Sequence, residues 1–319
     1  MNGFDFIVNP ASGNGRAKKS WDLFEQARGG LGTDRVHWTK HRGHAQEIAR
    51  QLQHDGASCI VAVGGDGLLN EVVNGMYSGV PSEFPDTPHG VHETGAVRRS
   101  RLAHLPAGSG CDFARHFQIP KNPQVWQDVL ESKNVAPVDV GKVTWEAVTG
   151  ETCERYFVTL AMAGIAGDIA ETMDRWGKPL GGFLSYLIVS LKHLLVAKAR
   201  KLTLTVDGEK LANDSYHLVT LANTATTAGM RIAPEADAGD GKFDLVLVRG
   251  MSRMRLLWNF RRIYQGTHVH ATGVEYRKVE TLSAESGSVN VLMNIDGEPL
   301  GRLPAKFELV PSPLELMVP

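Results

Sequence analysis

Apolar and amphipathic segments alternate along the first third of the chain. Apolar, β-prone runs cover residues 4–10, 35–40, 58–65 and 101–108, and helical spacing of apolar positions follows at 16–30, 43–56, 68–76 and 112–119. The run at 58–65 is continuously apolar, which is typical of a strand buried on both faces of a sheet. This alternation predicts an α/β domain with a doubly wound parallel sheet. Residues 80–100 interrupt it with Pro, Gly and polar residues, so we expect a long loop there.

The pattern changes from about Val138 to short β-prone runs joined by turn residues. These runs cover residues 138–148, 155–164, 200–211, 215–224, 242–250, 288–300 and 305–319. Asp-Gly pairs at 207–208 and 296–297 are typical of hairpin turns. Helical stretches interrupt the runs at 183–199 and 253–264. We therefore predict a nucleotide-binding α/β domain over 1–137 and a mostly antiparallel β-sandwich domain over 138–310. The tail 311–319 is a candidate to return to the first domain, and a nucleotide cleft is expected between the two.

Composition narrows the class of protein without identifying its chemistry. The 319 residues are 42% hydrophobic and 22% charged, with a formal net charge of -1, so we expect a globular protein with no nucleic-acid partner. The cysteines Cys59, Cys111 and Cys153 have neither metal-ligand nor disulfide-framework spacing, which favours a reducing compartment. The N-terminal segment MNGFDFIVNP lacks the pattern of a signal peptide. We accordingly expect a cytoplasmic location.

One apolar segment, residues 183–197, is a candidate for a membrane span. It contains Lys192 and His193 and falls short of the roughly 20 residues that cross a bilayer. A buried or interfacial helix is therefore the prediction for this segment.

Three glycine-containing segments follow predicted strands of the first domain. They read NPASGNG at 9–15, GGDGLLNE at 64–71 and PAGSGCDF at 106–113. Ligands of open parallel sheets bind beyond the carboxyl ends of the strands, where glycine lets backbone N–H groups approach an anion and a helix N-terminus adds positive potential. Each segment alone is equally typical of an ordinary turn. Three of them at successive strand ends favour a nucleotide.

Five segments in order resemble the diacylglycerol kinase catalytic family, which includes sphingosine, ceramide and bacterial lipid kinases. They are IVNPASGNGRAKK, AVGGDGLLNEVVNG, LPAGSGCDFAR, GMRIAPEADAGDGKFDLVLV and MNIDGEP. The resemblance covers nearly the whole chain and implies phosphoryl transfer from ATP, with Mg²⁺, to a lipid hydroxyl. Diacylglycerol is the default substrate, with phosphatidic acid as the product, and a sphingoid-type lipid is the alternative within the family.

The resemblance also implies a set of nucleotide-binding residues. They are Asn9, Pro10, Ser12, Gly13, Thr39, Gly65, Asp66, Gly67, Leu68, Asn70, Glu71 and Ser109. Leu68 and Ser109 stand where the family usually has Thr, as in the sphingosine kinase branch. Cys111 replaces the usual Asn, and we expect a buried, inert thiol there.

Two hairpin carboxylates and one aspartate are the catalytic candidates. By resemblance, Glu298 is the general base, with Asp296 beside it, and Asp66 is the alternative base and the organiser of Mg²⁺. A plain hairpin turn explains the same residues, since VDGEKL at 206–211 repeats the tetrapeptide.

A further metal site is expected in the second domain. There the resemblance implies a structural Mg²⁺ on Asp237, Asp240 and the carbonyl of Lys242, with an Asp-Gly turn as the alternative.

The remaining expectations concern the lipid. Asp168 resembles the acid that faces the lipid head group, or is a surface helix acid. Helix 183–197 lines an acyl pocket or is simply core. The cluster Arg249, Arg253, Arg255, Arg261 and Arg262 meets anionic head groups or is a solvated helix face.

From these residues we expect peripheral contact with the inner face of the membrane and leave a homodimer open. Two rival functions also stay open. One is a soluble-substrate kinase with the same GGDG turn, such as an NAD kinase or a phosphofructokinase. The other is a regulator that binds nucleotide or lipid without catalysis.

Overall fold

The computed structural model describes residues 3–30, 32–78, 99–176, 182–287 and 290–319. The chain divides into two compact units, one formed by Met1–Val140 with Val310–Pro319 and the other by Gly141–Leu309. The loop expected at 80–100 lies outside the described residues, except for Arg99 and Ser100.

A six-stranded sheet forms the centre of the first unit, with the strand order β2-β1-β3-β4-β18-β5. The strands are β1 (Asp5–Val8), β2 (Arg35–Trp38), β3 (Cys59–Gly64), β4 (Arg101–Pro106), β5 (Val135–Val138) and β18 (Leu314–Met317). Neighbours from β2 to β18 run parallel, and only β5 pairs antiparallel, with β18. The predicted parallel α/β sheet is confirmed, and the last strand of the chain lies within it.

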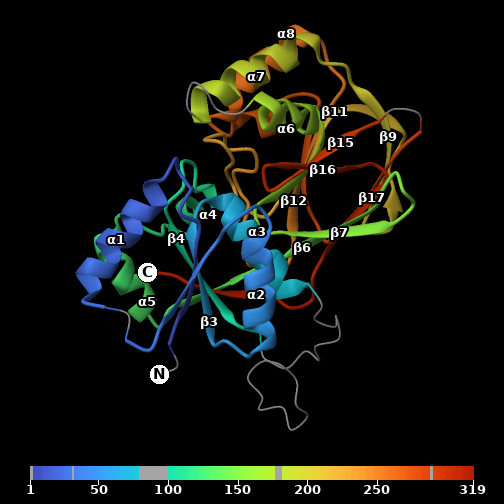
Figure 1. Ribbon diagram of the computed structural model, residues 1–319. Helices are drawn as coiled ribbons and strands as arrows, with labels where there is room; N and C mark the ends of the chain where they lie inside the picture. The colour runs from blue at the N-terminus through green and yellow to red at the C-terminus, as the bar shows by residue number, and fades with distance from the viewer. Residues whose placement is uncertain (1–2, 31, 79–98, 177–181, 288–289) are drawn as a thin grey trace. The chain divides into compact units, whose positions relative to one another are not determined.

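Helices cover both faces of this sheet (Figure 1). They are α1 (Arg16–Arg28), α2 (His44–His54), α3 (Asp66–Tyr77), α4 (Asp112–His116), η1 (Pro123–Val125) and α5 (Trp126–Glu131). Phe6 and Val8 of β1 pack against Trp21 of α1 and Trp126 of α5 in one buried cluster. On the other side α2 packs on α3, so closely that a Cβ on Gly75 would lie 2.3 Å from the carbonyl oxygen of Gln46.

The strand order reverses between β1 and β3, because the chain runs from β1 to β2 on one side and then crosses back to β3 on the other. In doubly wound sheets such a switch point opens a crevice at the carboxyl ends of the strands, where ligands bind. The loops that follow β1 and β3 therefore flank the place where this fold binds its ligand.

The second unit is built on an antiparallel sheet. Its strands are β6 (Gly141–Glu146), β7 (Thr152–Phe157), β8 (Leu160–Gly164), β9 (Arg200–Val206), β10 (Glu209–Lys210), β11 (Asp214–Ala222), β12 (Phe243–Arg249), β13 (Val274–Val279), β14 (Thr281–Ser286), β15 (Leu292–Ile295), β16 (Glu298–Arg302) and β17 (Ala305–Leu309). Every pairing recorded among them is antiparallel, as predicted.

Two expected strands are each divided in the structure. The run 155–164 breaks after Phe157, where backbone N–H groups turn to a side chain, and continues as β8. The run 305–319 breaks around Pro311 and Pro313, which cannot donate ladder hydrogen bonds, so β17 and β18 belong to different sheets.

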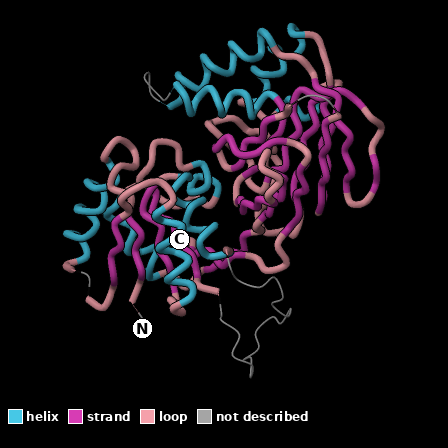
Figure 2. Tube along the Cα trace, turned by 45° about the vertical axis from the view of Figure 1, so that its right-hand side comes forward, coloured by secondary structure: helices cyan, strands magenta, loops and turns pink. Residues whose placement is uncertain are grey.

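Three helices lie on one face of this sheet (Figure 2), namely α6 (Ile165–Trp176), α7 (Gly182–Val196) and α8 (Arg253–Ile263), and the short η2 (Thr267–His270) follows α8. Side chains alternate between two clusters along the strands. Ala161 and Ala163 of β8 join the core that contains Phe157, whereas Leu160 and Met162 face the helical side. None of the helices in the described part of the chain has the length and hydropathy to cross a membrane.

Candidate active site

The three predicted phosphate loops lie against one another in the first unit. A Cβ on Gly108 would lie 2.5 Å from the Cα of Gly65, and one on Gly13 would lie 2.8 Å from the carbonyl oxygen of Ala107. Side chains at Gly108 or Gly13 would therefore push the third loop away from the other two. The glycines are required by close packing between loops as well as by turn conformation.

The first loop is ordered by its own polar groups. Asn9 accepts a hydrogen bond from the N–H of Ala11 at 3.0 Å, and the N–H of Ser12 donates to the carbonyl of Asn9 at 3.1 Å. Pro10 stands inside this turn, and Gly13 adopts a left-handed φ of 63°. This turn leads directly into α1, so the loop and the helix N-terminus form one unit.

Asp66 joins the second loop to the third. Its carboxylate accepts hydrogen bonds from the N–H groups of Asp112 at 3.1 Å and Phe113 at 3.3 Å. These are the first N–H groups of α4, which a helix leaves without partners of its own. Asp66 therefore acts as a helix cap supplied by another loop, a role that the sequence did not reveal.

Arg16 is a cation of the site that the sequence analysis missed. Its Nε donates to the carbonyl of Gly13 at 2.9 Å, and its Nη2 donates to Oγ of Ser109 at 3.1 Å. One guanidinium thus connects the first and third loops, and Lys121 adds a second positive charge by donating to Gly110 at 2.9 Å. The signal was a basic residue at the first position of a helix that follows a glycine loop.

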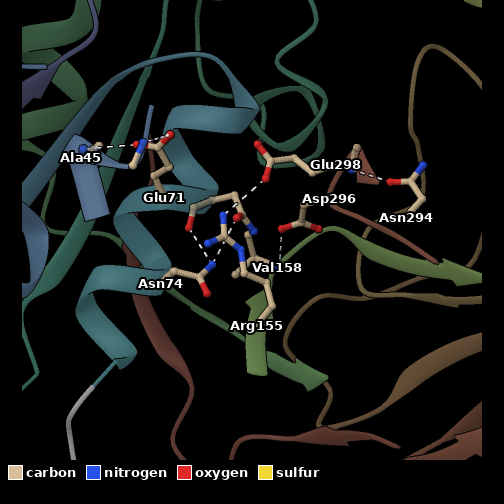
Figure 3. Close-up of polar contacts among 11 residues, drawn as sticks. Ala45, Glu71, Asn74, Arg155, Val158, Asn294, Asp296 and Glu298 are labelled. Atoms are coloured by element: carbon tan, nitrogen blue, oxygen red, sulfur yellow. Dashed lines mark hydrogen bonds and ion pairs between the residues drawn. The ribbon is translucent and has the colours of Figure 1, made fainter. Parts of the chain in front are cut away.

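Several residues of α3 that are predicted to bind the nucleotide have side chains that pack or form hydrogen bonds within the first unit. Leu68 is 5% exposed and packs against Gly64, and Asn70 is 1% exposed. Glu71 accepts hydrogen bonds from Gly43 at 2.9 Å and Ala45 at 3.2 Å and so caps α2 (Figure 3). These three side chains therefore pack or form hydrogen bonds within the first unit, whereas nothing lies within 4 Å of a Cβ built on Gly67.

Thr39 follows β2 and is partly exposed. Its N–H donates to the carbonyl of Val8 at 2.9 Å, which extends the pairing of β1 and β2 by one residue. Thr39 therefore lies at the same carboxyl edge of the sheet as the first loop.

Two fully buried side chains lie in the third loop and on the strand that precedes it. Cys111 is fully buried with a left-handed φ of 56°, so the expected burial of this thiol is confirmed, and burial raises its pKa to about 11. His104 is also fully buried, and burial lowers its pKa to about 4, so its ring is neutral near pH 7. Neither group carries charge at neutral pH.

Asp296 clamps a turn in the second unit. Its carboxylate accepts hydrogen bonds from the N–H groups of Val158, Thr159 and Leu160, each at 3.0 Å, and from the hydroxyl of Thr159 (Figure 3). The other Asp-Gly hairpin works in the same way, because Asp207 accepts from Glu280 at 2.9 Å and Thr281 at 2.8 Å. Both aspartates stabilise the backbone around a hairpin turn.

Glu298 distinguishes the two hairpins. Both turns have positive φ at Asp and Gly, 48° and 90° at Asp296 and Gly297, as type I′ turns require. Glu298 is only partly exposed and its carboxylate lies 3.6 Å from the guanidinium of Arg155, whereas Glu209 in the other hairpin is exposed. Arg155 is 143 positions away in sequence, so no sequence pattern could have indicated this pair.

The predicted structural metal site is a turn with its own cation. Asp237 accepts a hydrogen bond from Gly239 at 3.1 Å, and Asp240 accepts from the N–H of Lys242 at 3.0 Å. The second oxygen of Asp240 forms an ion pair with Lys278, which raises the pKa of that lysine. The donor set has the charge for a divalent cation, and a cation there competes with Lys278.

Asp168 lies in the first turn of α6. Its carboxylate pairs with Arg200 at 2.6 Å, and both side chains are largely buried. The acid is therefore held in one orientation, and its role toward a lipid head group stays a prediction.

An apolar cavity of about 80 Å³ lies between the sheet of the second unit and its helices. Its walls come mainly from α6, α7, α8 and the strands beneath them, and include Ile165, Tyr186, Leu194, Val248 and Phe260. The inner side of α7, within the segment 183–197, packs in the core and also lines this apolar cavity.

Two histidines interrupt the apolar wall of this cavity. Nε2 of His217 donates to Met251 and Nε2 of His268 donates to Ile232, each at 3.1 Å. In the neutral ring Nδ1 is then an acceptor, and neither Nδ1 atom finds a donor within the described ranges. Burial lowers the pKa of His268 to about 4, so that ring stays neutral.

Two family models together match most of the chain. The diacylglycerol kinase catalytic domain matches residues 4–143. The YegS C-terminal NAD kinase beta sandwich-like domain matches residues 159–318.

Curated relatives and solved structures agree with these models. A diacylglycerol kinase of Staphylococcus haemolyticus (strain JCSC1435) is 30% identical over 98% of this chain and 87% of its own length. One from Staphylococcus aureus (strain MRSA252) is 28% identical over 98% of this chain and 91% of its own length. A diacylglycerol kinase structure from Bacillus anthracis str. Sterne covers 100% of this chain and 97% of its own with a TM-score of 0.68 at 18% identity. Yeast NADH kinase, solved with NADH, shares the fold with a TM-score of 0.57 at 11% identity, covering 99% of this chain and 83% of its own.

Proposed function

Because the chain belongs to the diacylglycerol kinase catalytic-domain family and is a kinase, we propose that it phosphorylates a lipid hydroxyl with ATP. Diacylglycerol is the proposed substrate and phosphatidic acid the product, after the names of the curated relatives. The observation that carries this proposal is the junction of three glycine loops at the switch point of the parallel sheet. That junction offers backbone N–H groups and a helix N-terminus to a polyphosphate.

The phosphates of ATP are proposed to lie over the second loop. Gly65 precedes α3 and has no side chain to cap it, so the first N–H groups of that helix can face an anion. Nothing in the protein lies within 4 Å of a Cβ built on Gly67, which leaves room for a phosphate. Arg16 supplies positive charge beside the same loops.

Glu298 is the proposed general base. The hydroxyl oxygen of the lipid attacks the γ-phosphorus, the bond from that phosphorus to the bridging oxygen breaks, ADP leaves, and Glu298 accepts the hydroxyl proton. Arg155 orients the carboxylate of Glu298. Asp296 is proposed to position this hairpin, because its oxygens already accept several backbone hydrogen bonds.

Mg²⁺ is the proposed metal, and when bound it neutralises charge on the phosphates. A carboxylate has about four acceptor positions, so Asp66 can cap α4 and still accept hydrogen bonds from water on Mg²⁺. A second Mg²⁺ is proposed on Asp237, Asp240 and the carbonyl of Lys242, where it has to displace Lys278 from Asp240.

The apolar cavity of the second unit supports a lipid substrate. A cavity walled by Ile165, Leu194 and Val248 favours an acyl chain over a sugar or a dinucleotide. Asp168, held by Arg200, is proposed to face the polar head of that lipid. Since the substrate resides in a bilayer, we place the protein peripherally at the inner face of the membrane.

A soluble-substrate kinase is the second candidate. The observation that favours it is the fold shared with yeast NADH kinase. A regulator without catalysis is less well supported, because Asp66, Glu298 and Arg155 are all held in ordered positions.

One labelling experiment tests the proposal. The purified chain is incubated with radiolabelled ATP, Mg²⁺, mixed membrane lipids, NAD and sugars, and the labelled products are separated. We expect label in phosphatidic acid. Label in another phosphorylated lipid would identify a different lipid substrate. Label in NADP or a sugar phosphate would support the soluble-substrate kinase. The absence of label from every product would overturn the assignment as a kinase of these substrates.

A further inference from the structure

Helix α7 presents an apolar stripe to solvent. Leu184, Ile188, Leu191 and Leu195 are 46%, 40%, 38% and 55% exposed, and their spacing of four, three and four residues places them on one side of the helix. The opposite side of the same helix is buried, through residues such as Val189 and Leu194. Both sides of α7 are therefore apolar, and within the described residues only one of them is covered.

Helix α8 continues this exposed surface. It packs beside α7 (Figure 1), and its Met254 and Trp258, one turn apart, are 77% and 62% exposed. The guanidinium of Arg261 lies 5.9 Å from the ring centre of Trp258. An exposed Trp beside a cation is typical of side chains that insert at a membrane–water interface. We call these six apolar side chains and the helix surface around them the α7–α8 face.

The charge of the two helices has one sign. Together α7 and α8 contain five Lys or Arg residues and no Asp or Glu, in a chain whose net charge is -1. Arg253 and Arg255 stand in the first turn of α8, where the helix dipole disfavours cations. The helix dipole therefore does not stabilise these two cations.

Two of the five arginines that were expected to meet anionic head groups interact with other parts of the protein instead. Arg249 is paired with Asp214 and Glu275, so its positive charge is already balanced within the protein. Arg262 is partly buried and donates to the carbonyl of Thr267 at 2.5 Å. The exposed cations of the α7–α8 face are Lys192, Arg253, Arg255 and Arg261.

We propose that the α7–α8 face docks on a bilayer surface of anionic phospholipid, with its apolar side chains entering the acyl boundary. This proposal rests on the proposed function, since a lipid kinase has to reach its substrate. Charge complementarity selects the partner, because each basic residue near an acidic bilayer contributes about 1 kcal/mol, or roughly a fivefold gain in binding. A second copy docked symmetrically on this face would bring like charges together.

The position of the apolar cavity agrees with this orientation. Tyr186 and Leu194 on the inner side of α7, and Leu256 and Phe260 of α8, line the cavity. The two helices therefore lie between the docking face and the cavity. Docking through this face would bring the cavity within one helix layer of the bilayer.

The test uses flotation of the full chain with vesicles of phosphatidylcholine, with and without phosphatidylglycerol. One variant combines Met254→Ser and Trp258→Ser, and another combines Arg253→Gln and Arg255→Gln, which relieves charge at a helix N-terminus and spares the fold. Leu23→Ser and Lys19→Gln on α1 are the matched controls, since Leu23 is 51% exposed and Lys19 is also exposed.

We expect the arginine variant to lower binding to anionic vesicles by about 25-fold, from two fivefold steps. The Met254 and Trp258 variant should lower it by at least about tenfold, because two apolar side chains no longer enter the acyl boundary, and the controls should bind like the wild type. The arginine variant should also lose about half of the dependence on salt, because Lys192 and Arg261 remain on the face. Unchanged vesicle binding in both double variants overturns the proposal. So does a change from dimer to monomer in the Trp258 variant with vesicle binding retained, because a second copy would then cover this face.

A kinase assay with short-chain diacylglycerol dispersed below its micelle concentration separates this proposal from the proposed function. The double variants should keep wild-type turnover there, because they leave the phosphate loops and the hairpin of Glu298 unchanged. If the wild type binds anionic vesicles through this face but labels no lipid, the proposed function fails and the docking face stands.

Discussion

Arg16 connects two of the three glycine loops through one guanidinium, and it is an exposed cation of that junction. Because it bonds to Gly13 and Ser109, it fixes the distance between the loops and adds positive charge beside them. A residue that binds phosphate and takes no part in proton transfer should affect affinity more than turnover.

We therefore expect Arg16→Gln to raise the KM for ATP about tenfold, with kcat changed less than about twofold, since one charge-assisted hydrogen bond is worth about 1.5 kcal/mol. Lys19→Gln, one turn further along α1, should leave KM unchanged. Steady-state kinetics at varied ATP measure both. A fall in kcat at constant KM would contradict the role given to Arg16.

At the residue scale the sequence identified chain segments better than side-chain roles. Asp66 and Glu71 were expected at the nucleotide, but both cap helices whose first turns come from other segments. Such caps depend on tertiary contacts, which a local pattern does not contain. The role of Arg155 could not be predicted for the same reason. The role of Arg16 could have been predicted, because Arg16 directly follows the first glycine loop.

At the scale of elements, the loop junction depends on the absence of side chains at two glycines. A Cβ on Gly108 would overlap the Cα of Gly65, whereas one on Gly67 would meet nothing within 4 Å. Gly67 lies in the first turn of α3 without a positive φ, so alanine suits its conformation.

This difference predicts opposite effects of the same substitution. Gly108→Ala should lower the free energy of unfolding by about 1–3 kcal/mol, because a neighbouring backbone has to move. Gly67→Ala should leave it unchanged or raise it by less than about 1 kcal/mol. Urea unfolding followed by far-UV circular dichroism compares them, and equal effects would show that the loops do not touch at Gly108.

Most elements could be predicted, because hydrophobic periodicity and turn chemistry are local. Both Asp-Gly hairpins, the parallel strands and the helices at 182–196 and 253–263 are present. The breaks within 155–164 and 305–319 were missed. In the first case Asp296, in the turn between β15 and β16, imposes the break from a distant part of the chain, and in the second the two prolines mark the boundary.

At the scale of the whole molecule, two buried histidines of the described residues, one in each unit, have a strongly lowered pKa. His104 in the first unit and His268 in the second both have a pKa of about 4, lowered by burial. Their unfolded pKa is about 6.5. Between these values the unfolded chain binds a proton and the native protein does not, so stability falls as the pH falls.

We expect the free energy of unfolding of each unit to drop by about 1.4 kcal/mol per pH unit below about pH 6.5. Urea unfolding at about pH 7 and pH 5 measures the slope. His104→Gln should flatten the slope of the first unit and leave that of the second. Equal stability at the two pH values would show that these rings are hydrated in the native state.

The proposal for this chain is phosphorylation of a lipid with Glu298 as the general base. Its most direct test is the rate of label transfer from ATP to diacylglycerol by the wild type, by Glu298→Gln and by Glu209→Gln in the matching hairpin. We predict that Glu298→Gln lowers kcat at least about 100-fold with ATP binding and folding retained, since a general base contributes about 10²–10⁴-fold. Glu209→Gln should stay within about twofold of the wild type, and near-normal turnover of Glu298→Gln would contradict the account.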